Sequence, residues 1–384
     1  MRIDGFDILR GLCAVGVAYY HILGWVHADD FNLNNIGLYG VYVFFILSGA
    51  SIWIAYANRI EAGLPLSNFI ALRFFRVAPL YWLAAILTPH FVGGKYNVPA
   101  FVLNLPFGFG FGNPGQTSAV TGGWSLGIEF VFYLIFPVLL AFAKGRLLPV
   151  ITLIGLYLAQ LIFISIQIKQ EGDLAKNWIS YTQYLGFAYY FFAGMLIAKF
   201  CVQWPTALPK RILLLNRLLF PLLLLSVAVS SGSYIEQSIQ GWRAILLPLA
   251  CSALVLSAAG LFWQQRTKAV KIFATLMGNS SYGVYLLHPL IYGKAQKHLS
   301  ELKADSPLLF ASLVILMAFL LALLLERYVE RPIRGYGKRK FGKTFVKQGA
   351  QQEAPSEAQA APVTQRPAGL IIPSGEPTYR NQKS

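Results

Sequence analysis

The chain has 384 residues, of which 56% are hydrophobic and 12% charged, and its mean hydropathy is +0.55. This composition excludes an ordinary soluble domain, in which about 25% of residues are charged. The 32 Lys and Arg outnumber the 16 Asp and Glu. They lie in small clusters between long apolar segments with no single basic face, so nucleic acid is not the expected partner. The three cysteines lie in apolar segments without a CxxC pair, so we expect free thiols and no metal site.

Apolar segments long enough to cross about 30 Å of hydrocarbon follow one another along the chain. The segment 98–111 is too short and too interrupted by Pro and Gly to span, so we expect it to lie in the interface or to re-enter the membrane. The sequence predicts an all-α membrane protein with about ten transmembrane helices, near residues 6–25, 36–57, 74–92, 124–143, 147–167, 181–200, 212–231, 243–263, 272–292 and 307–327.

The basic residues predict the orientation of these helices. With an even number of spans, both termini lie on one side, and few Lys and Arg fall in the turns of the opposite side. Cytoplasmic segments carry the excess of Lys and Arg, so we predict that both termini are cytoplasmic. Residues 1–340 form the predicted membrane domain. Residues 341–384, rich in Gln, Ala, Pro, Glu and Lys, are predicted to be a disordered cytoplasmic tail.

The presence of ionisable side chains inside the predicted helices requires an explanation, because their burial in a membrane is costly. Arg10 and His21 are eleven residues apart, which places them on one helix face about 16 Å apart along the axis. The same rise per residue places His21, Glu129 and His288 at a similar depth, about 22–24 Å from the cytoplasmic face. Such a cluster would suit general acid–base catalysis. The alternative is that each side chain bonds a neighbouring helix.

Two further arginines, Arg73 and Arg76, form an RxxR pair near the cytoplasmic start of the third predicted helix. Residues three apart are neighbours on a helix surface. With Arg10, they would clamp phosphate groups, because guanidinium groups match phosphate oxygens. The alternative is that they anchor the protein to lipid headgroups.

Other polar residues are interpreted as structural. Ser48 and Gly49 are small residues of the kind that permits close helix packing, which we favour over a nucleophilic role for Ser48. Glu326 ends the tenth predicted helix, and we expect it to pair with Arg327 or Arg331.

Six segments follow one another along the chain: FDILRGLCAVGVAYYH, GVYVFFILSGASI, RFFRVAPLYW, WSLGIEFVFYLIFP, GNSSYGVYLLHP and ERYVERPIR. In this order they resemble motifs of the acyltransferase-3 family of integral membrane O-acyltransferases, which modify extracytoplasmic carbohydrates. They cover about residues 3–340. Two positions depart from the family pattern: Ile8 replaces a common Gly and Tyr42 a frequent acidic residue. Neither is a proposed catalytic group.

The resemblance implies that His21 acts with Arg10, that the RxxR arginines help to hold the donor, and that Glu129 and His288 line the site. The implied reaction moves an acyl group, most simply acetyl, from cytoplasmic acyl-CoA to a sugar hydroxyl of a polysaccharide or lipid-linked glycan. Acetyl-CoA would be a substrate, and no permanently bound cofactor is expected. The implied location is a bacterial inner membrane. We expect no fused soluble domain, so the acyl group would pass directly to the acceptor.

A proton-coupled secondary transporter or flippase is the alternative function. In that case His21, Glu129 and His288 would relay protons through a central cavity. Helices broken in mid-membrane and paired between two halves would favour it, whereas the predicted helices are mostly unbroken.

Overall fold

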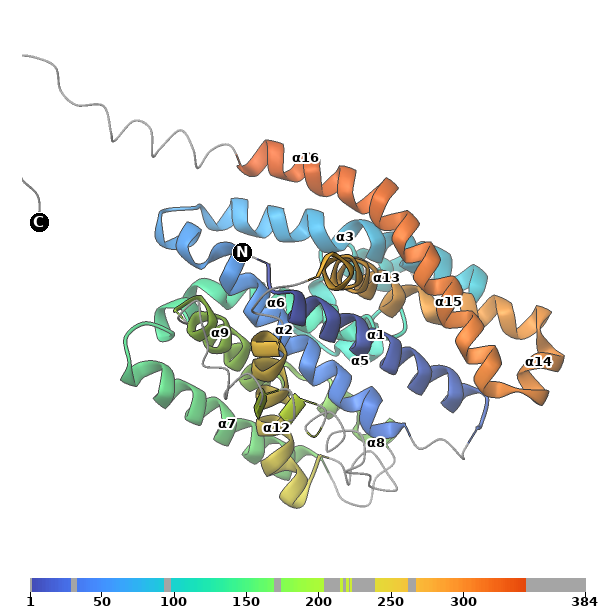
Figure 1. Ribbon diagram of the computed structural model, residues 1–384, viewed down its shortest axis with the longest axis horizontal. Helices are drawn as coiled ribbons and strands as arrows, with labels where there is room; N and C mark the ends of the chain where they lie inside the picture. The colour runs from blue at the N-terminus through green and yellow to red at the C-terminus, as the bar shows by residue number, and fades with distance from the viewer. Residues whose placement is uncertain are drawn as a thin grey trace, which may run out of the picture. The chain divides into compact units, whose positions relative to one another are not determined.

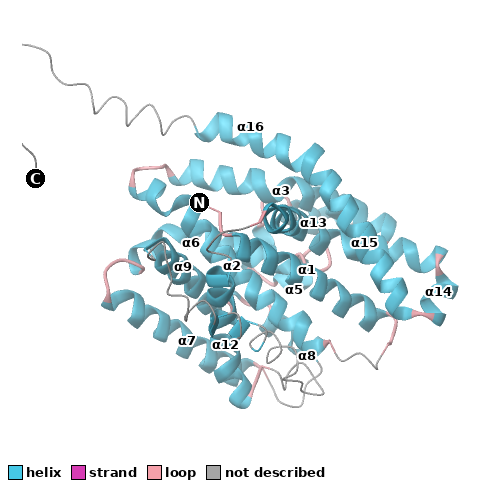
Figure 2. Cartoon of the chain, viewed as in Figure 1, coloured by secondary structure: helices cyan, strands magenta, loops and turns pink. Residues whose placement is uncertain are grey.

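The computed structural model describes residues 2–28, 33–92, 98–168, 174–203, 215–216, 219–220, 222, 239–261 and 267–342. Regular structure in these residues is entirely helical, which confirms the predicted all-α fold (Figures 1 and 2). The long helices are α1 (Asp4–Trp25), α2 (Asn34–Glu61), α3 (Leu66–Phe91), α6 (Trp124–Phe142), α7 (Leu147–Gln167), α9 (Ala188–Gln203), α12 (Gly241–Leu261), α13 (Lys268–His298), α15 (Pro307–Leu325) and α16 (Arg331–Gly342).

Short helical segments connect several of these helices. The predicted non-spanning segment 98–111 is divided into two of them and neither is long enough to cross a bilayer. The short elements are α4 (Val98–Asn104), η1 (Gly108–Phe111), α5 (Pro114–Thr117), α8 (Leu174–Tyr181), η2 (Tyr184–Gly186) and α14 (Ser300–Asp305), together with the π-helical turn η3 (Glu326–Glu330).

Within the described ranges, seven helices are long and apolar enough to cross a membrane: α1, α2, α3, α6, α7, α12 and the helix that starts with α15. The chain is therefore a multi-pass membrane protein. The sixth predicted span starts later than expected, because the short helix η2 precedes α9, which has 16 residues. The ninth predicted span lies within the 31-residue helix α13. The predicted span 212–231 lies largely outside the described residues, so the count of ten stays a prediction, as does the side of the termini.

Helix α1 packs against α2, α12, α13 and α15 (Figure 1). Small residues bring α1 close to α13. A Cβ atom added at Gly11 would lie 2.5 Å from Cβ of Met277, and one at Gly278 would lie 2.6 Å from Oδ1 of Asp7. Real atoms do not approach this closely, so glycine is required for the observed packing. The close approach fixes the two helices that carry His21 and His288.

Helices α2 and α9 cross through a reciprocal pair of glycines. A Cβ atom at Gly194 would lie 1.9 Å from the carbonyl oxygen of Ile46, and one at Gly49 would lie 2.0 Å from that of Phe191. Each glycine therefore contacts the backbone of the other helix. The packing role predicted for Gly49 agrees with this contact.

The last helices are continuous with one another. Helix α15 passes through the π-helical turn η3 into α16, which lies along α3 (Figure 1). A Cβ atom at Gly337 would lie 2.9 Å from Cβ of Phe75, so α16 and α3 are in close contact there. Of the predicted tail, only residues 341 and 342 are described, and they end α16.

The α2–α9 crossing predicts that Gly194→Val destabilises the protein. The added atoms would overlap the backbone of α2 at Ile46, which cannot turn aside as a side chain can. Overpacking of this kind costs about 1–3 kcal/mol or more. The melting temperature of the detergent-purified variant measures the effect. Gly155→Ala on α7 is the control, because nothing lies within 4 Å of its added Cβ. Equal melting temperatures for the two variants would contradict the close crossing.

Candidate active site

A cavity of about 180 Å³ lies between α1, α2, α3, α6 and α13. It is lined by all three arginines predicted to hold a donor, together with the predicted site residue Glu129. Its other lining residues are Phe44, Ser48, Ser51, Val77, Ser125, Leu126, Tyr133, Ser281, Tyr282 and Tyr285. Four of the six predicted site residues thus share one cavity.

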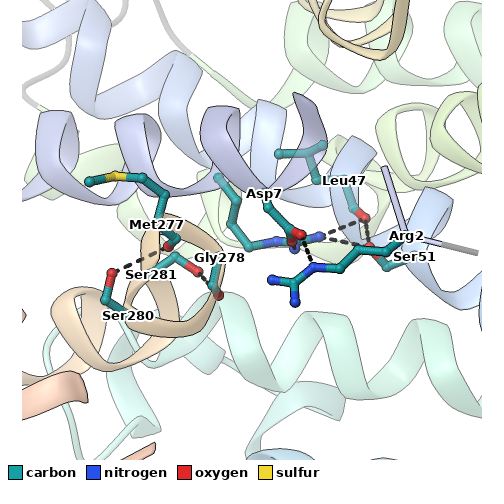
Figure 3. Close-up of polar contacts among 9 residues, drawn as sticks. Arg2, Asp7, Leu47, Ser51, Met277, Gly278, Ser280 and Ser281 are labelled. Carbon is teal, nitrogen blue, oxygen red and sulfur yellow. Dashed lines mark hydrogen bonds and ion pairs between the residues drawn. The ribbon is translucent and has the colours of Figure 1, made fainter. Parts of the chain in front are cut away.

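The Arg10 guanidinium is held by groups on α1 and α2. Nη2 donates hydrogen bonds to Oγ of Ser51, at 2.7 Å, and to the carbonyl oxygen of Leu47, at 3.3 Å. Nη1 forms an ion pair with Oδ1 of Asp7 at 3.2 Å. Asp7 also accepts a hydrogen bond from Arg2 (Figure 3). Arg10 is therefore fixed in direction while it lines the cavity.

A chain of hydrogen bonds joins Arg73 to Ser48 across three helices. Nη2 of Arg73 donates to Oη of Tyr133 at 2.6 Å, and the guanidinium carbon lies 4.4 Å from the centre of the same ring. The Tyr133 hydroxyl donates to Oε1 of Glu129, and so does the hydroxyl of Ser48. Ser48 therefore contacts a carboxylate in the cavity, which differs from its predicted packing role.

The third arginine, Arg76, forms an ion pair with Glu330, with 3.1 Å between Nη1 and Oε2. In the same π-helical turn, Glu326 pairs with Arg334 at 2.9 Å. The sequence predicted Arg327 or Arg331 as the partner of Glu326, and this prediction is wrong. A π-helical turn holds more residues than an α-helical one, so a residue eight positions later lies on the same face.

Beyond the cavity, His21 and His288 face each other. Nδ1 of His21 lies 2.9 Å from Nε2 of His288, and the rings are nearly parallel, at 11°. Nδ1 of His288 lies 3.0 Å from the carbonyl oxygen of Val284, which can only accept a hydrogen bond. Neutral His288 must therefore donate from Nδ1 and accept at Nε2, so that His21 donates from Nδ1. This tautomer leaves the lone pair of His21 on Nε2, where it can take a proton.

Aromatic residues surround this histidine pair. The Trp25 ring stacks on His21, with ring centres 5.3 Å apart and an angle of 6°, and also contacts Tyr292. Tyr285 precedes His288 by one helical turn, and its ring centre lies 6.5 Å from that of the histidine. Tyr285 also lines the cavity. It therefore connects the cavity to the histidine pair.

The structure brings His21 to His288, but it gives Glu129 different partners. The Glu129 carboxylate faces Ser48 and Tyr133, and no contact with either histidine is found among the described residues. Of the three residues predicted to lie at a similar depth, His21 and His288 therefore meet, whereas Glu129 contacts other side chains. Depth along the helix axis was estimated from the sequence, whereas the direction of each side chain around its helix depends on packing.

Several polar residues of the site were not predicted from the sequence. Tyr133 follows Glu129 by four residues, a spacing that places both on one helix face. Glu330 lies in the same short segment as Glu326, but it contacts a helix far away in the sequence. The role of Tyr133 could therefore be predicted from its spacing in the sequence, whereas the contact of Glu330 required the tertiary structure.

The family model for the acyltransferase domain matches residues 3–327. The chain therefore belongs to the acyltransferase-3 family of membrane O-acyltransferases, as the motifs predicted. Membership makes it an enzyme with an acyl donor and an acyl acceptor.

Three relatives show how far the similarity extends. The exopolysaccharide production protein ExoZ of Rhizobium meliloti is 28% identical over 79% of this chain and 92% of its own length. The putative peptidoglycan O-acetyltransferase YrhL of Bacillus subtilis is 26% identical over 89% of this chain and 56% of its own length. The peptidoglycan O-acetyltransferase OatA of Listeria monocytogenes is 25% identical, with corresponding shares of 89% and 57%. No solved structure matches the chain.

The hydrogen-bond chain predicts that Tyr133→Phe lowers kcat/KM for the acyl donor about tenfold or more. The substitution keeps the ring and removes the hydroxyl that joins Arg73 to Glu129, and hydrogen bonds to charged groups contribute about 1.5–3 kcal/mol. Acyl transfer by the purified full chain measures the effect. Tyr189→Phe is the matched control, because Tyr189 is a buried tyrosine that bonds Ser252 and does not line the cavity. Similar kinetics for both variants would count against a role for the chain.

Proposed function

We propose that the protein transfers an acetyl group from cytoplasmic acetyl-CoA to a hydroxyl of an extracytoplasmic polysaccharide or lipid-linked glycan. Family membership supports the acyl transfer. The names of the three relatives refer to an exopolysaccharide and to peptidoglycan, both of which are carbohydrate polymers. The proposed location is a bacterial inner membrane, crossed by ten helices with both termini in the cytoplasm.

The observation that carries the proposal is the convergence of Arg10, Arg73 and Arg76 on one cavity. Guanidinium groups bind phosphate oxygens well, and the donor carries several phosphates. The cavity of about 180 Å³ is small beside the roughly 300–1,000 Å³ of common ligand pockets. It would therefore hold only part of the donor, with the phosphate groups at the arginines and the acyl end directed toward the histidine pair.

The histidine pair supplies the base in this proposal. Nε2 of His21 takes the proton of the acceptor hydroxyl while the oxygen attacks the thioester carbonyl carbon. The carbon–sulfur bond then breaks, and the sulfur leaves as the CoA thiol after receiving the proton. His288 holds His21 in the required tautomer. An acyl-histidine intermediate would use the same lone pair and is the alternative route.

Glu129 has a separate role in this proposal. With Tyr133 and Ser48, it keeps Arg73 in position to bind the phosphate groups of the donor.

The test is His21→Ala, with transfer from radiolabelled acetyl-CoA to soluble polysaccharide fragments by purified protein in liposomes. The rate should fall about 10²–10⁴-fold, because a positioned general base contributes about that much. His298→Ala is the control, because His298 is an exposed residue in the last turn of α13. A His21→Ala variant that is inserted normally and transfers label at the wild-type rate would refute this mechanism.

A further inference from the structure

Glu330 lies near the end of the membrane domain in sequence but beside the cavity in space. It is the last residue of the π-helical turn η3, and its side chain is 2% exposed. The side chain of its partner Arg76 is 30% exposed and lines the cavity. The ion pair is therefore buried at the carboxylate and accessible at the guanidinium.

The charges around Arg76 explain why it needs this carboxylate. Arg10, Arg73 and Arg334 all act on Arg76 as like charges, while Glu330 supplies the attraction. Such interactions are strong where little water is present to screen them. Without Glu330, repulsion would move the Arg76 side chain away from its place among the other guanidinium groups.

The backbone around Glu330 is also unusual. Single π-helical turns inside α-helices are rare and occur frequently at functional sites. Here the turn directs Glu330 toward Arg76 on α3 and Glu326 toward Arg334 on α16. Oε1 of Glu330 is buried without a hydrogen-bond partner in the described part of the chain. A pair that served stability alone would be expected to satisfy both oxygens, since a buried unsatisfied oxygen is costly.

We propose that Glu330 is a positioning residue for the acyl donor. It holds the Arg76 guanidinium toward the cavity, where Arg76 binds the phosphate groups of acyl-CoA, and it does not itself touch the donor. The inference rests on the proposed donor-binding role of Arg76. The helix that ends the membrane domain thereby contributes to a site built from helices at its beginning.

The first experiment measures the dissociation constant of acetyl-CoA for the full chain in lipid nanodiscs. Glu330→Gln keeps the size of the side chain and removes its charge, so the dissociation constant should rise about tenfold. Glu326→Gln is the matched control, because this carboxylate belongs to the same turn but pairs with Arg334, which does not line the cavity. It should bind acetyl-CoA as the wild type does. Wild-type binding by Glu330→Gln, or equal weakening by both variants, would overturn the inference.

A double-mutant cycle separates positioning from a general structural role. Arg76→Gln should weaken acetyl-CoA binding, and adding Glu330→Gln to it should weaken binding little further, because the two residues act as a unit. Independent, multiplying effects would overturn the inference. Unchanged binding by Arg76→Gln would remove the proposed role of Arg76 and the inference with it.

Glu330→Asp provides a second variant if Glu330→Gln does not fold. It keeps the charge but shortens the side chain, so it should weaken acetyl-CoA binding less than Glu330→Gln and leave the melting temperature close to that of the wild type. Binding by Glu330→Asp that is weaker than that by Arg76→Gln would contradict positioning through Arg76.

Discussion

The site depends on holding three guanidinium groups together inside a membrane protein. Charged groups at this depth are costly unless they are paired. Each arginine has its own anionic group: Asp7 for Arg10, Glu330 for Arg76, and Glu129, through Tyr133, for Arg73. The cavity can therefore present three guanidinium groups without an unbalanced charge.

This arrangement divides the proposed chemistry between two places. Polar groups on α1, α2, α3 and α6 surround the cavity, while the histidine pair joins α1 to α13. Helix α1 contributes to both, with Arg10 at one level and His21 about three turns further on. Close packing of α1 on α13 at Gly11 and Gly278 fixes the geometry that relates them. A donor held by the arginines and an acceptor activated by His21 could meet near Tyr285.

Counting along the sequence predicted the positions that depend on distance along a helix. Apolar segment lengths predicted most of the long helices. The three arginines were predicted to meet because all of them lie near the cytoplasmic starts of their predicted helices. Similar depth placed His21 near His288. Counting failed where the position of a side chain depends on the rotation of its helix or on contacts between residues far apart in the sequence. Glu129 points to Ser48 and Tyr133 because α6 packs in that orientation, and the π-helical turn gave Glu326 a different partner.

In the proposed mechanism, acyl transfer proceeds across the membrane, from the arginine cavity to the histidine side. The most direct measurement uses sealed proteoliposomes of one orientation, with radiolabelled acetyl-CoA on the side of the N-terminus and soluble polysaccharide fragments on the other. We predict label in the polysaccharide only for this arrangement. Equal transfer with the two compounds exchanged, or with both on one side, would contradict it.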